Sequence, residues 1–184
     1  TGTAAIPVPR PDADAAGIRN VLIVVMASTS SRIVTGYDGP YSVTPNFARY
    51  VDEMGLQVSD AYAHSPDPGL SLISIAGGHE PDLWSPGATE TAEDLAGDGL
   101  AFILGAQGYR TGFFDSGDGR FQNIGGLAAA TGFEVVRDSR DWTCDLGGIE
   151  DSPGKDTARK HDICAARAVN DWIGLGDGKP FLAV

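Results

Sequence analysis

The sequence has few basic residues and no long apolar run, and each shortage disfavours a class of function. It has 13 Lys and Arg against 25 Asp and Glu, a formal charge of -12. Because phosphate contacts need clustered cations, this balance disfavours nucleic acid and anionic lipid as partners. A membrane-spanning helix needs roughly 20 apolar residues, and the longest candidate, VLIVVMA, covers only 21–27. We therefore expect membrane association only indirectly, through a partner or a removed anchor.

Cysteine and histidine are also scarce. Cys144 and Cys164 have only His161 as a nearby imidazole, and their spacing matches no zinc signature. They flank a segment rich in Gly, Pro and Asp, and a disulfide would restrict this loop in the unfolded chain. We therefore favour a disulfide formed in an extracytoplasmic compartment, periplasmic or secreted. The alternative is two unpaired thiols in a cytosolic protein.

Length and composition predict one domain with an N-terminal arm. The chain has 184 residues, of which 42% are hydrophobic, which is enough for one core. Residues 1–18 contain three prolines and no apolar periodicity, which predicts an extended Pro-rich arm before an α/β domain at 19–184. Since the sequence starts at Thr1 rather than Met, we expect that it was trimmed or that a leader or anchor was removed.

Strand and helix patterns alternate after the arm. The unbroken apolar run at 20–27 is typical of a strand buried on both faces. Further strands are predicted at 56–63, 109–117, 133–138 and 179–184. Helices are predicted at 45–54, 69–78, 91–108, 119–132 and 157–174. This alternation predicts an αβα sandwich around a mainly parallel sheet.

Four segments occur in an order that resembles the N-terminal half of the sulfatase family, in the alkaline phosphatase superfamily. They are RNVLIVVMASTSSR, TPNFARYVDEMGLQVSDAYAHSP, SLISIAGGHEP and GYRTGFFDSGDGRFQNIGGLAAATGFEVV. The resemblance covers 19–184 and implies a fold that is truncated relative to the family. It also implies that some of the family's metal ligands and its anion-binding residues lie in a C-terminal half, beyond the position of KPFLAV. It also implies ester hydrolysis, in which a divalent metal lowers the pKa of a nucleophile at a helix start.

The metal positions that the resemblance implies are degenerate. The family's first strand delivers one or two acidic metal ligands, but Ala27 and Ser28 stand at these positions. Alanine has no donor atom, and a neutral serine is a poor ligand for a hard cation.

The implied nucleophile region is degenerate as well. Matching the family's Gly and Pro places Pro68 at the nucleophile, and proline has no nucleophilic atom. A shift of one residue would place Asp67 there instead, but the Gly to Pro spacing then fails. Ser71 matches the serine of the family motif, whereas Leu72 replaces its basic residue.

Other polar residues near these positions have simpler interpretations. His64 and His79 flank the nucleophile region, and we expect one to shape a loop and the other to be exposed. The segment DSGDGR at 115–120 falls short of a calcium loop and predicts a turn with Asp118 as the capping residue.

These patterns lead to one preferred hypothesis and two alternatives. We predict a catalytically inactive sulfatase-like domain without a cofactor, a structural or interaction subunit that binds protein partners through its arm and sheet edge. The first alternative is the N-terminal part of a sulfuric or phosphoric ester hydrolase that uses a divalent metal (Ca, Mg, Mn or Zn). The second is an anion-binding module without turnover, which binds at the helix start near Gly69.

Overall fold

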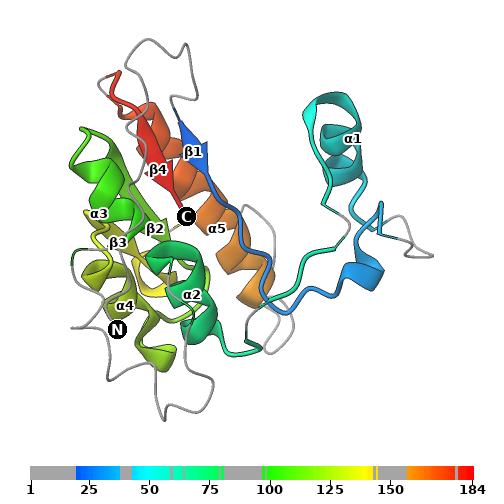
Figure 1. Ribbon diagram of the computed structural model, residues 1–184, viewed down its shortest axis with the longest axis horizontal. Helices are drawn as coiled ribbons and strands as arrows, with labels where there is room; N and C mark the ends of the chain where they lie inside the picture. The colour runs from blue at the N-terminus through cyan, green and yellow to red at the C-terminus, as the bar shows by residue number, and fades with distance from the viewer. Residues whose placement is uncertain are drawn as a thin grey trace, which may run out of the picture.

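A computed structural model describes residues 20–37, 43–58, 60–63, 65–78, 80, 97, 99–142, 144, 157–176 and 178–184. Its strands are β1 (Val21–Leu22), β2 (Arg110–Phe114), β3 (Val135–Arg137) and β4 (Phe181–Ala183). They form one parallel sheet in the order β1-β4-β2-β3 (Figure 1). The α-helices are α1 (Pro45–Met54), α2 (Pro68–Gly77), α3 (Leu100–Gly105), α4 (Ile124–Ala130) and α5 (Thr157–Gly174). Short 3-10 helices are η1 (Ser31–Ile33), η3 (Phe121–Asn123) and η4 (Ser139–Asp141).

The sheet lies between two helix layers. Successive side chains of β2 and β4 point to opposite faces of the sheet, and each face is covered by helices. Phe113 and Leu182 join a buried cluster with apolar residues of α2, α3 and α4. Phe114 and Phe181 instead contact Trp172 of α5, with ring centroids 5.5 and 5.9 Å apart. The predicted αβα sandwich with a parallel sheet is therefore confirmed.

The helices with clear start and stop signals lie where the sequence predicts them. In α2, Pro68 occupies the first turn and Gly78 ends the helix with a left-handed φ of 69°. The predicted ranges of α1 and α5 are also confirmed. The predicted helix at 119–132 is present as η3 and α4. Of the predicted helix at 91–108, the described residues form α3, which ends at Gly105 rather than at 108, and 91–96 lie outside the described residues.

Helix α1 stands apart from the sandwich (Figure 1). Thr44, its N-cap, makes no side-chain cap hydrogen bond. The Thr44 hydroxyl instead accepts from the backbone N–H of Thr35 (2.8 Å), and the Thr35 hydroxyl accepts from the N–H of Thr44 (3.1 Å). This reciprocal pair closes the loop before the helix, while Phe47 and Tyr50 remain exposed.

The strand prediction at 56–63 is wrong and the one at 20–27 is confirmed only in part, and both concern segments that leave the sandwich. The segment predicted as a strand at 56–63 has no strand among its described residues, and Leu56 and Tyr62 are 90% and 89% exposed. The run at 20–27 forms only the short β1, and Val24 is 73% exposed. Strand β1 lies at the sheet edge and pairs with β4 alone, so no second neighbour buries it. The predicted arm at 1–18 lies outside the described residues.

The predicted disulfide is confirmed. Cys144 follows η4 and Cys164 lies in α5, and their Cα atoms are 5.7 Å apart. The disulfide therefore links the segment that follows β3 and η4 to helix α5. None of the described helices combines the length and apolarity that a membrane span needs.

Replacing both Cys144 and Cys164 with Ala should destabilise the fold by about 3 kcal/mol, because the bridge restricts the intervening chain in the unfolded state. Urea unfolding under oxidising conditions measures this difference. Alanine is the appropriate replacement because Cys164 is buried and a serine hydroxyl there would need a partner. Reductant should lower the stability of the native protein to that of the variant and leave the variant unchanged, and equal stability of both oxidised proteins would contradict the role of the bridge.

Candidate functional site

The candidate site lies at the carboxyl ends of the strands, where parallel α/β sheets bind ligands. Two loops there, after β2 and after β3, are joined by backbone hydrogen bonds. The N–H of Asp115 donates to the carbonyl of Arg137, and the N–H of Ser139 donates to the carbonyl of Gly117. Both N···O distances are 2.8 Å. The start of α2 joins them, because the N–H of Gly69 donates to the Gln122 side chain (3.2 Å). The β2 and β3 loops and the α2 start therefore form one continuous surface.

Asp67 is the N-cap of α2. Its Oδ1 accepts from the N–H of Leu70 (3.0 Å), and its Oδ2 accepts from Nε2 of Gln122 (2.6 Å). Such a cap contributes about 1 kcal/mol to helix stability. Both oxygens of this carboxylate, which stands one residue before the predicted nucleophile position, are thus bound within the fold.

The serines beside Asp67 shape the turn before α2. Ser65 is buried, and its hydroxyl accepts from the N–H of Asp67 (3.0 Å). The Ser71 hydroxyl donates to the Ser65 carbonyl (3.0 Å). Pro68 occupies the first helical position, where its fixed φ and missing N–H suit a helix start. These contacts hold the loop in place and give Ser71 and Pro68 structural roles that need no part in catalysis.

Gln122 was not predicted from the sequence, yet it connects the two halves of the site. Gln122 and the following Asn123 have left-handed φ angles of 49° and 52°. Two such residues in succession cost conformational energy and persist only where surrounding contacts hold them. The paired hydrogen bonds of Gln122 to Asp67 and Gly69 supply such contacts. No spacing in the sequence signals this link, since more than 50 residues separate its partners.

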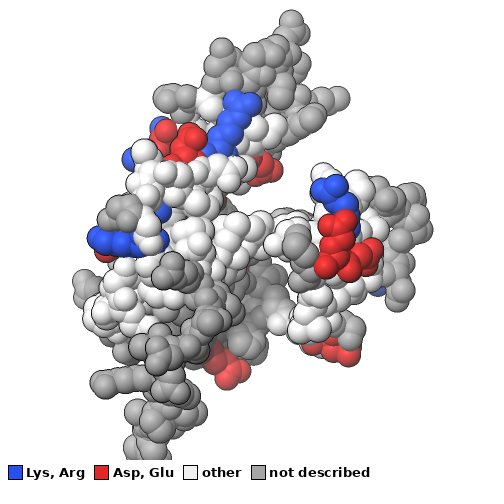
Figure 2. Space-filling view, turned by 90° about the horizontal axis from the view of Figure 1, so that it is seen from above, with Lys and Arg blue, Asp and Glu red and all other residues white. Residues whose placement is uncertain are grey.

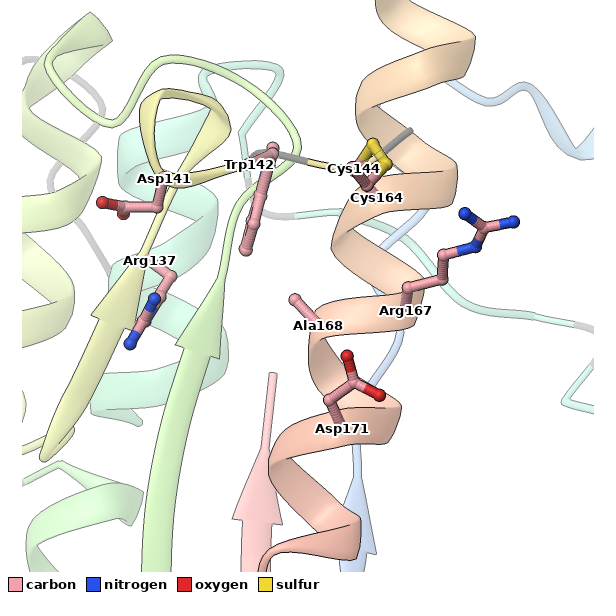
Figure 3. A pocket seen from close by; sticks show the side chains of 8 residues that line it. All are labelled: Arg137, Asp141, Trp142, Cys144, Cys164, Arg167, Ala168 and Asp171. Atoms are coloured by element: carbon pink, nitrogen blue, oxygen red, sulfur yellow. A yellow bond between two sulfur atoms is a disulfide. The ribbon is translucent and has the colours of Figure 1, made fainter. Parts of the chain in front are cut away.

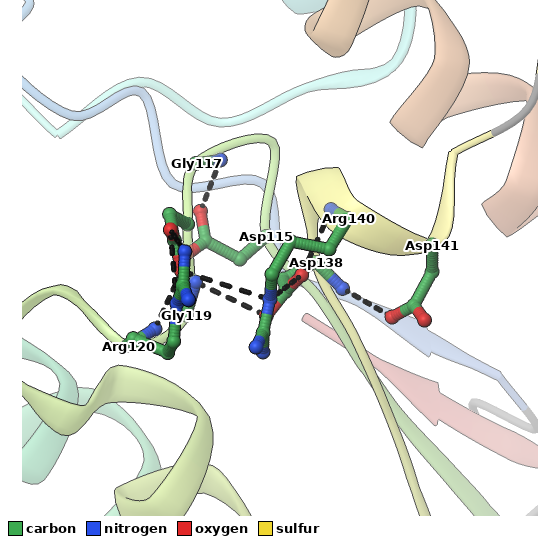
Figure 4. A network of polar contacts seen from close by, with 8 residues as sticks. Asp115, Gly117, Gly119, Arg120, Asp138, Arg140 and Asp141 are labelled. Carbon is green, nitrogen blue, oxygen red and sulfur yellow. Dashed lines mark hydrogen bonds and ion pairs between the residues drawn. The ribbon is translucent and has the colours of Figure 1, made fainter.

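An ion-pair network covers the β2 and β3 loops (Figure 4). Asp118 accepts from Nε of Arg120 (2.9 Å), and Asp138 accepts from Nε of Arg140 (2.9 Å). Arg140 also lies 3.6 Å from Asp118 and so connects the two pairs. Both carboxylates also accept the backbone N–H two residues later, at 3.0 and 2.9 Å. The repeated Asp-x-Arg pattern is the sequence signal that would have revealed both pairs.

Asp138 is the buried member of the network, with 5% of its surface exposed. Hydrogen bonds from the Arg140 side chain lower the pKa of Asp138, and burial partly opposes this effect. The N–H of Gly119 donates to it as well (3.1 Å), and a Cβ at Gly119 would lie 2.6 Å from the carboxylate. For the exposed Asp118, hydrogen bonds from Arg120 lower the pKa. The predicted turn with Asp118 as its cap is confirmed.

The structure places the implied metal positions on an exposed segment. Ala27 and Ser28 are both exposed, and Ser28 has a left-handed φ of 57°. Their donor set does not fit a divalent metal, since it offers one neutral hydroxyl and no carboxylate. No group of three or more His, Cys, Asp or Glu side chains in the described part of the chain is placed to hold a metal. Leu72, at the family's basic position, is 7% exposed and belongs to the core. His64 and His79 lie outside the described residues.

A pocket of about 220 Å³ lies beside the disulfide. In Figure 3, the Trp142 indole lies between the strands and α5, whereas Arg167 projects away from it. The indole Nε1 is buried and has no hydrogen-bond partner. Sequence reasoning missed this pocket, because it depends on how η4 meets α5.

Two solved structures share this fold. One is a protein in the alkaline phosphatase superfamily from Vibrio parahaemolyticus, with a TM-score of 0.67 and 22% identity. The other is the lipoteichoic acid synthase LtaP from Listeria monocytogenes, with a TM-score of 0.58 and 19% identity. Each match covers 90% of this chain but 39% of the other. Neither a protein-family model nor a curated protein matches the sequence. The likeness confirms the fold, while the sulfatase assignment and the degenerate positions stay predictions.

Replacing Asp138 with Asn should weaken the protein's response to acid. A carboxyl whose pKa is lowered by folding stabilises the fold above its unfolded pKa, near 3.9. This stabilisation is lost as pH falls through the lower pKa of the folded state. We therefore expect the variant to be less stable at neutral pH and to lose less stability below about pH 5. Unfolding measured across this range tests the expectation.

Glu53→Gln is the matched control, because it removes an exposed carboxyl of α1 far along the chain from the network. It should retain the native acid dependence. If Asp138→Asn and the native protein lost stability equally steeply in acid, the network would not carry the pH dependence.

Proposed function

We propose that this domain, which has the fold of the alkaline phosphatase superfamily, is catalytically inactive and serves as a structural or interaction unit in a larger assembly. The observation that carries the proposal is the state of Asp67. This carboxylate caps α2 and accepts a second hydrogen bond from Gln122. It therefore acts as a structural group, one residue before Pro68, the position at which the resemblance implies a nucleophile.

The surrounding chemistry supports the loss of catalysis. Hydrogen bonds from Leu70 and Gln122 occupy both oxygens of Asp67, so neither oxygen is free to attack an ester. The Ser71 hydroxyl donates to a backbone carbonyl, although a nucleophilic serine needs a base that accepts its proton. Ala27 and Ser28 provide no carboxylate for a metal that would activate either group.

The exposed side of β1 supports an interaction role. Ile23 donates its N–H to Ala183 of β4 (2.8 Å), so the N–H groups of Leu22 and Val24 point away from the sheet. Apolar side chains along this segment are exposed, namely Leu22, Val24, Val25 and Met26, and the described surface between the sandwich and α1 is largely uncharged (Figure 2). Unpaired strand edges of this kind bind further strands.

We infer that the occupant of this edge is a β-strand from polypeptide outside residues 1–184. Both structures of similar fold are longer, and this chain spans 39% of each. A strand that paired with β1 would satisfy its outward N–H groups and cover its apolar side chains. The disulfide supports an extracytoplasmic location for the assembly, because disulfides persist in oxidising compartments.

A hydrolase that is completed by further chain is the alternative, and the coverage of 39% favours it. We do not favour the anion-binding module, because the helix start uses its own donors. The N–H groups of Gly69, Leu70 and Ser71 donate to Gln122 and Asp67 at 3.2, 3.0 and 2.9 Å. An anion at this place would have to displace all three hydrogen bonds.

The catalytic half of the proposal is tested by metal analysis and ester hydrolysis on the native protein. We expect substoichiometric divalent metal and no hydrolysis of p-nitrophenyl sulfate or phosphate above the blank. Asp67→Asn is the matched variant, because asparagine caps helices as well as aspartate but lacks the anionic nucleophile. Stoichiometric metal together with turnover that Asp67→Asn abolishes would overturn the proposal and support the hydrolase.

The interaction half is tested by amide hydrogen exchange at Leu22 and Val24. Exchange should be fast in the purified chain, since none of the described strands pairs with this side of β1, and slow in the native assembly. Ile23, whose N–H is bonded to β4, is the internal control and should be protected in both. Equally fast exchange of Leu22 and Val24 in both samples would show that no strand binds the β1 edge.

A further inference from the structure

A second pocket lies at the opposite end of the sheet, where the strands begin. It has a volume of about 230 Å³, and its lining includes Asn20, Arg110, Gly176, Lys179 and Phe181. Arg110 and Phe181 are the first residues of β2 and β4, so this pocket is separate from the candidate site at the carboxyl ends. Its described lining contains two cationic side chains and no carboxylate, although the chain as a whole has a charge of -12.

Arg110 is held firmly in this pocket. Its backbone N–H donates to the Pro180 carbonyl (2.9 Å). Its guanidinium stacks on the indole of Trp172, with Cζ 4.3 Å from the ring centroid, and Nη1 donates to the Trp172 carbonyl (3.1 Å). These contacts fix the plane and the direction of the guanidinium group before any ligand binds.

Two other donors of Arg110 have no hydrogen-bond partner in the part of the chain that the structure describes. Both Nε and Nη2 are buried, and neither makes a hydrogen bond. A buried charged donor without a partner loses its hydration and gains nothing in return, which opposes folding. Nε and Nη2 also form one edge of the guanidinium, the pair of donors that binds the two oxygens of a carboxylate or phosphate.

We propose that this pocket binds a small oxyanion, a phosphate or a carboxylate, through the Nε and Nη2 edge of Arg110. The glycine-containing loop after α5 leaves room for it, because a Cβ at Gly176 would lie 2.9 Å from Nη2. This site is independent of the inactivity proposed above.

The test is titration of the full chain with sodium phosphate and, separately, sodium acetate, with sodium chloride at matched ionic strength as the blank. The readout is the Nε–Hε resonance of Arg110 in ¹H–¹⁵N spectra, which a bound oxyanion shifts directly. Saturable shifts with phosphate identify a phosphate site, and saturable shifts with acetate identify a carboxylate site. Absence of a saturable shift with either anion would overturn the proposal.

Arg110→Lys and Arg49→Lys form the matched pair of variants. Both keep the net charge, but only the first removes the paired donors, because lysine presents a single ammonium group. Since the exposed Arg49 lies on α1, we expect Arg49→Lys to bind as the native protein does and Arg110→Lys to bind about tenfold more weakly. Affinity here is followed by tryptophan fluorescence, since Trp172 lies beneath the guanidinium. Equal affinity in both variants would show that binding is unspecific.

Asp177 provides the last control, since it neighbours Gly176 in the sequence and lies outside the described residues. If Asp177→Asn bound phosphate and the native protein did not, the Asp177 carboxylate would be the counter-charge of Arg110. That result would overturn the proposal of an external ligand. Equal binding by both proteins would support it.

Discussion

The placement of β4 in the middle of the sheet is the constraint on which the other elements depend. β4 pairs with β1 on one side and with β2 on the other, so the N-terminal strand is joined to the sheet only by the last strand of the chain. Parallel pairing requires a crossover, and α5 provides it on the face where Trp172 packs against Phe114 and Phe181. At the amino end of the sheet, this closure places Pro180 beside Arg110.

Helix α2 lies against α4 and η3, and the contact with η3 decides the role of Asp67. A short polar side chain at a helix start suits both a cap and a nucleophile, so the residue type alone does not separate the two roles. The contacts of Gln122 distinguish the two roles. Its amide nitrogen donates to the Asp67 carboxylate, and its amide oxygen accepts from the N–H of Gly69. The left-handed backbone of Gln122 shows that the fold sustains a strained conformation to make this link.

The sequence predicts those elements whose signals are local. Pro68 and Gly78 delimit α2, and the apolar face and range of α5 are evident from spacing. The strand at 20–27 is shorter and more exposed than predicted because an apolar run has the same composition at a sheet edge as inside a sheet. The prediction at 56–63 failed because alternation alone does not supply neighbouring strands. In the site, Asp67, Pro68 and Ser71 were found as candidates, but Gln122 was not, because its contacts join segments distant in sequence.

The arginines at the two ends of the sheet follow different rules. At the carboxyl end, Arg120 and Arg140 each bind an aspartate two residues earlier, which supplies a local counter-charge. At the amino end, Gly108 stands two residues before Arg110, so no such partner is available, and an aromatic ring and one carbonyl hold the guanidinium instead. Electrostatic interactions are strongest where water is excluded. Arg120 and Arg140 have aspartate partners nearby in the sequence, and Arg110 does not. Of the three, Arg110 is therefore the arginine that an anion from elsewhere would stabilise most.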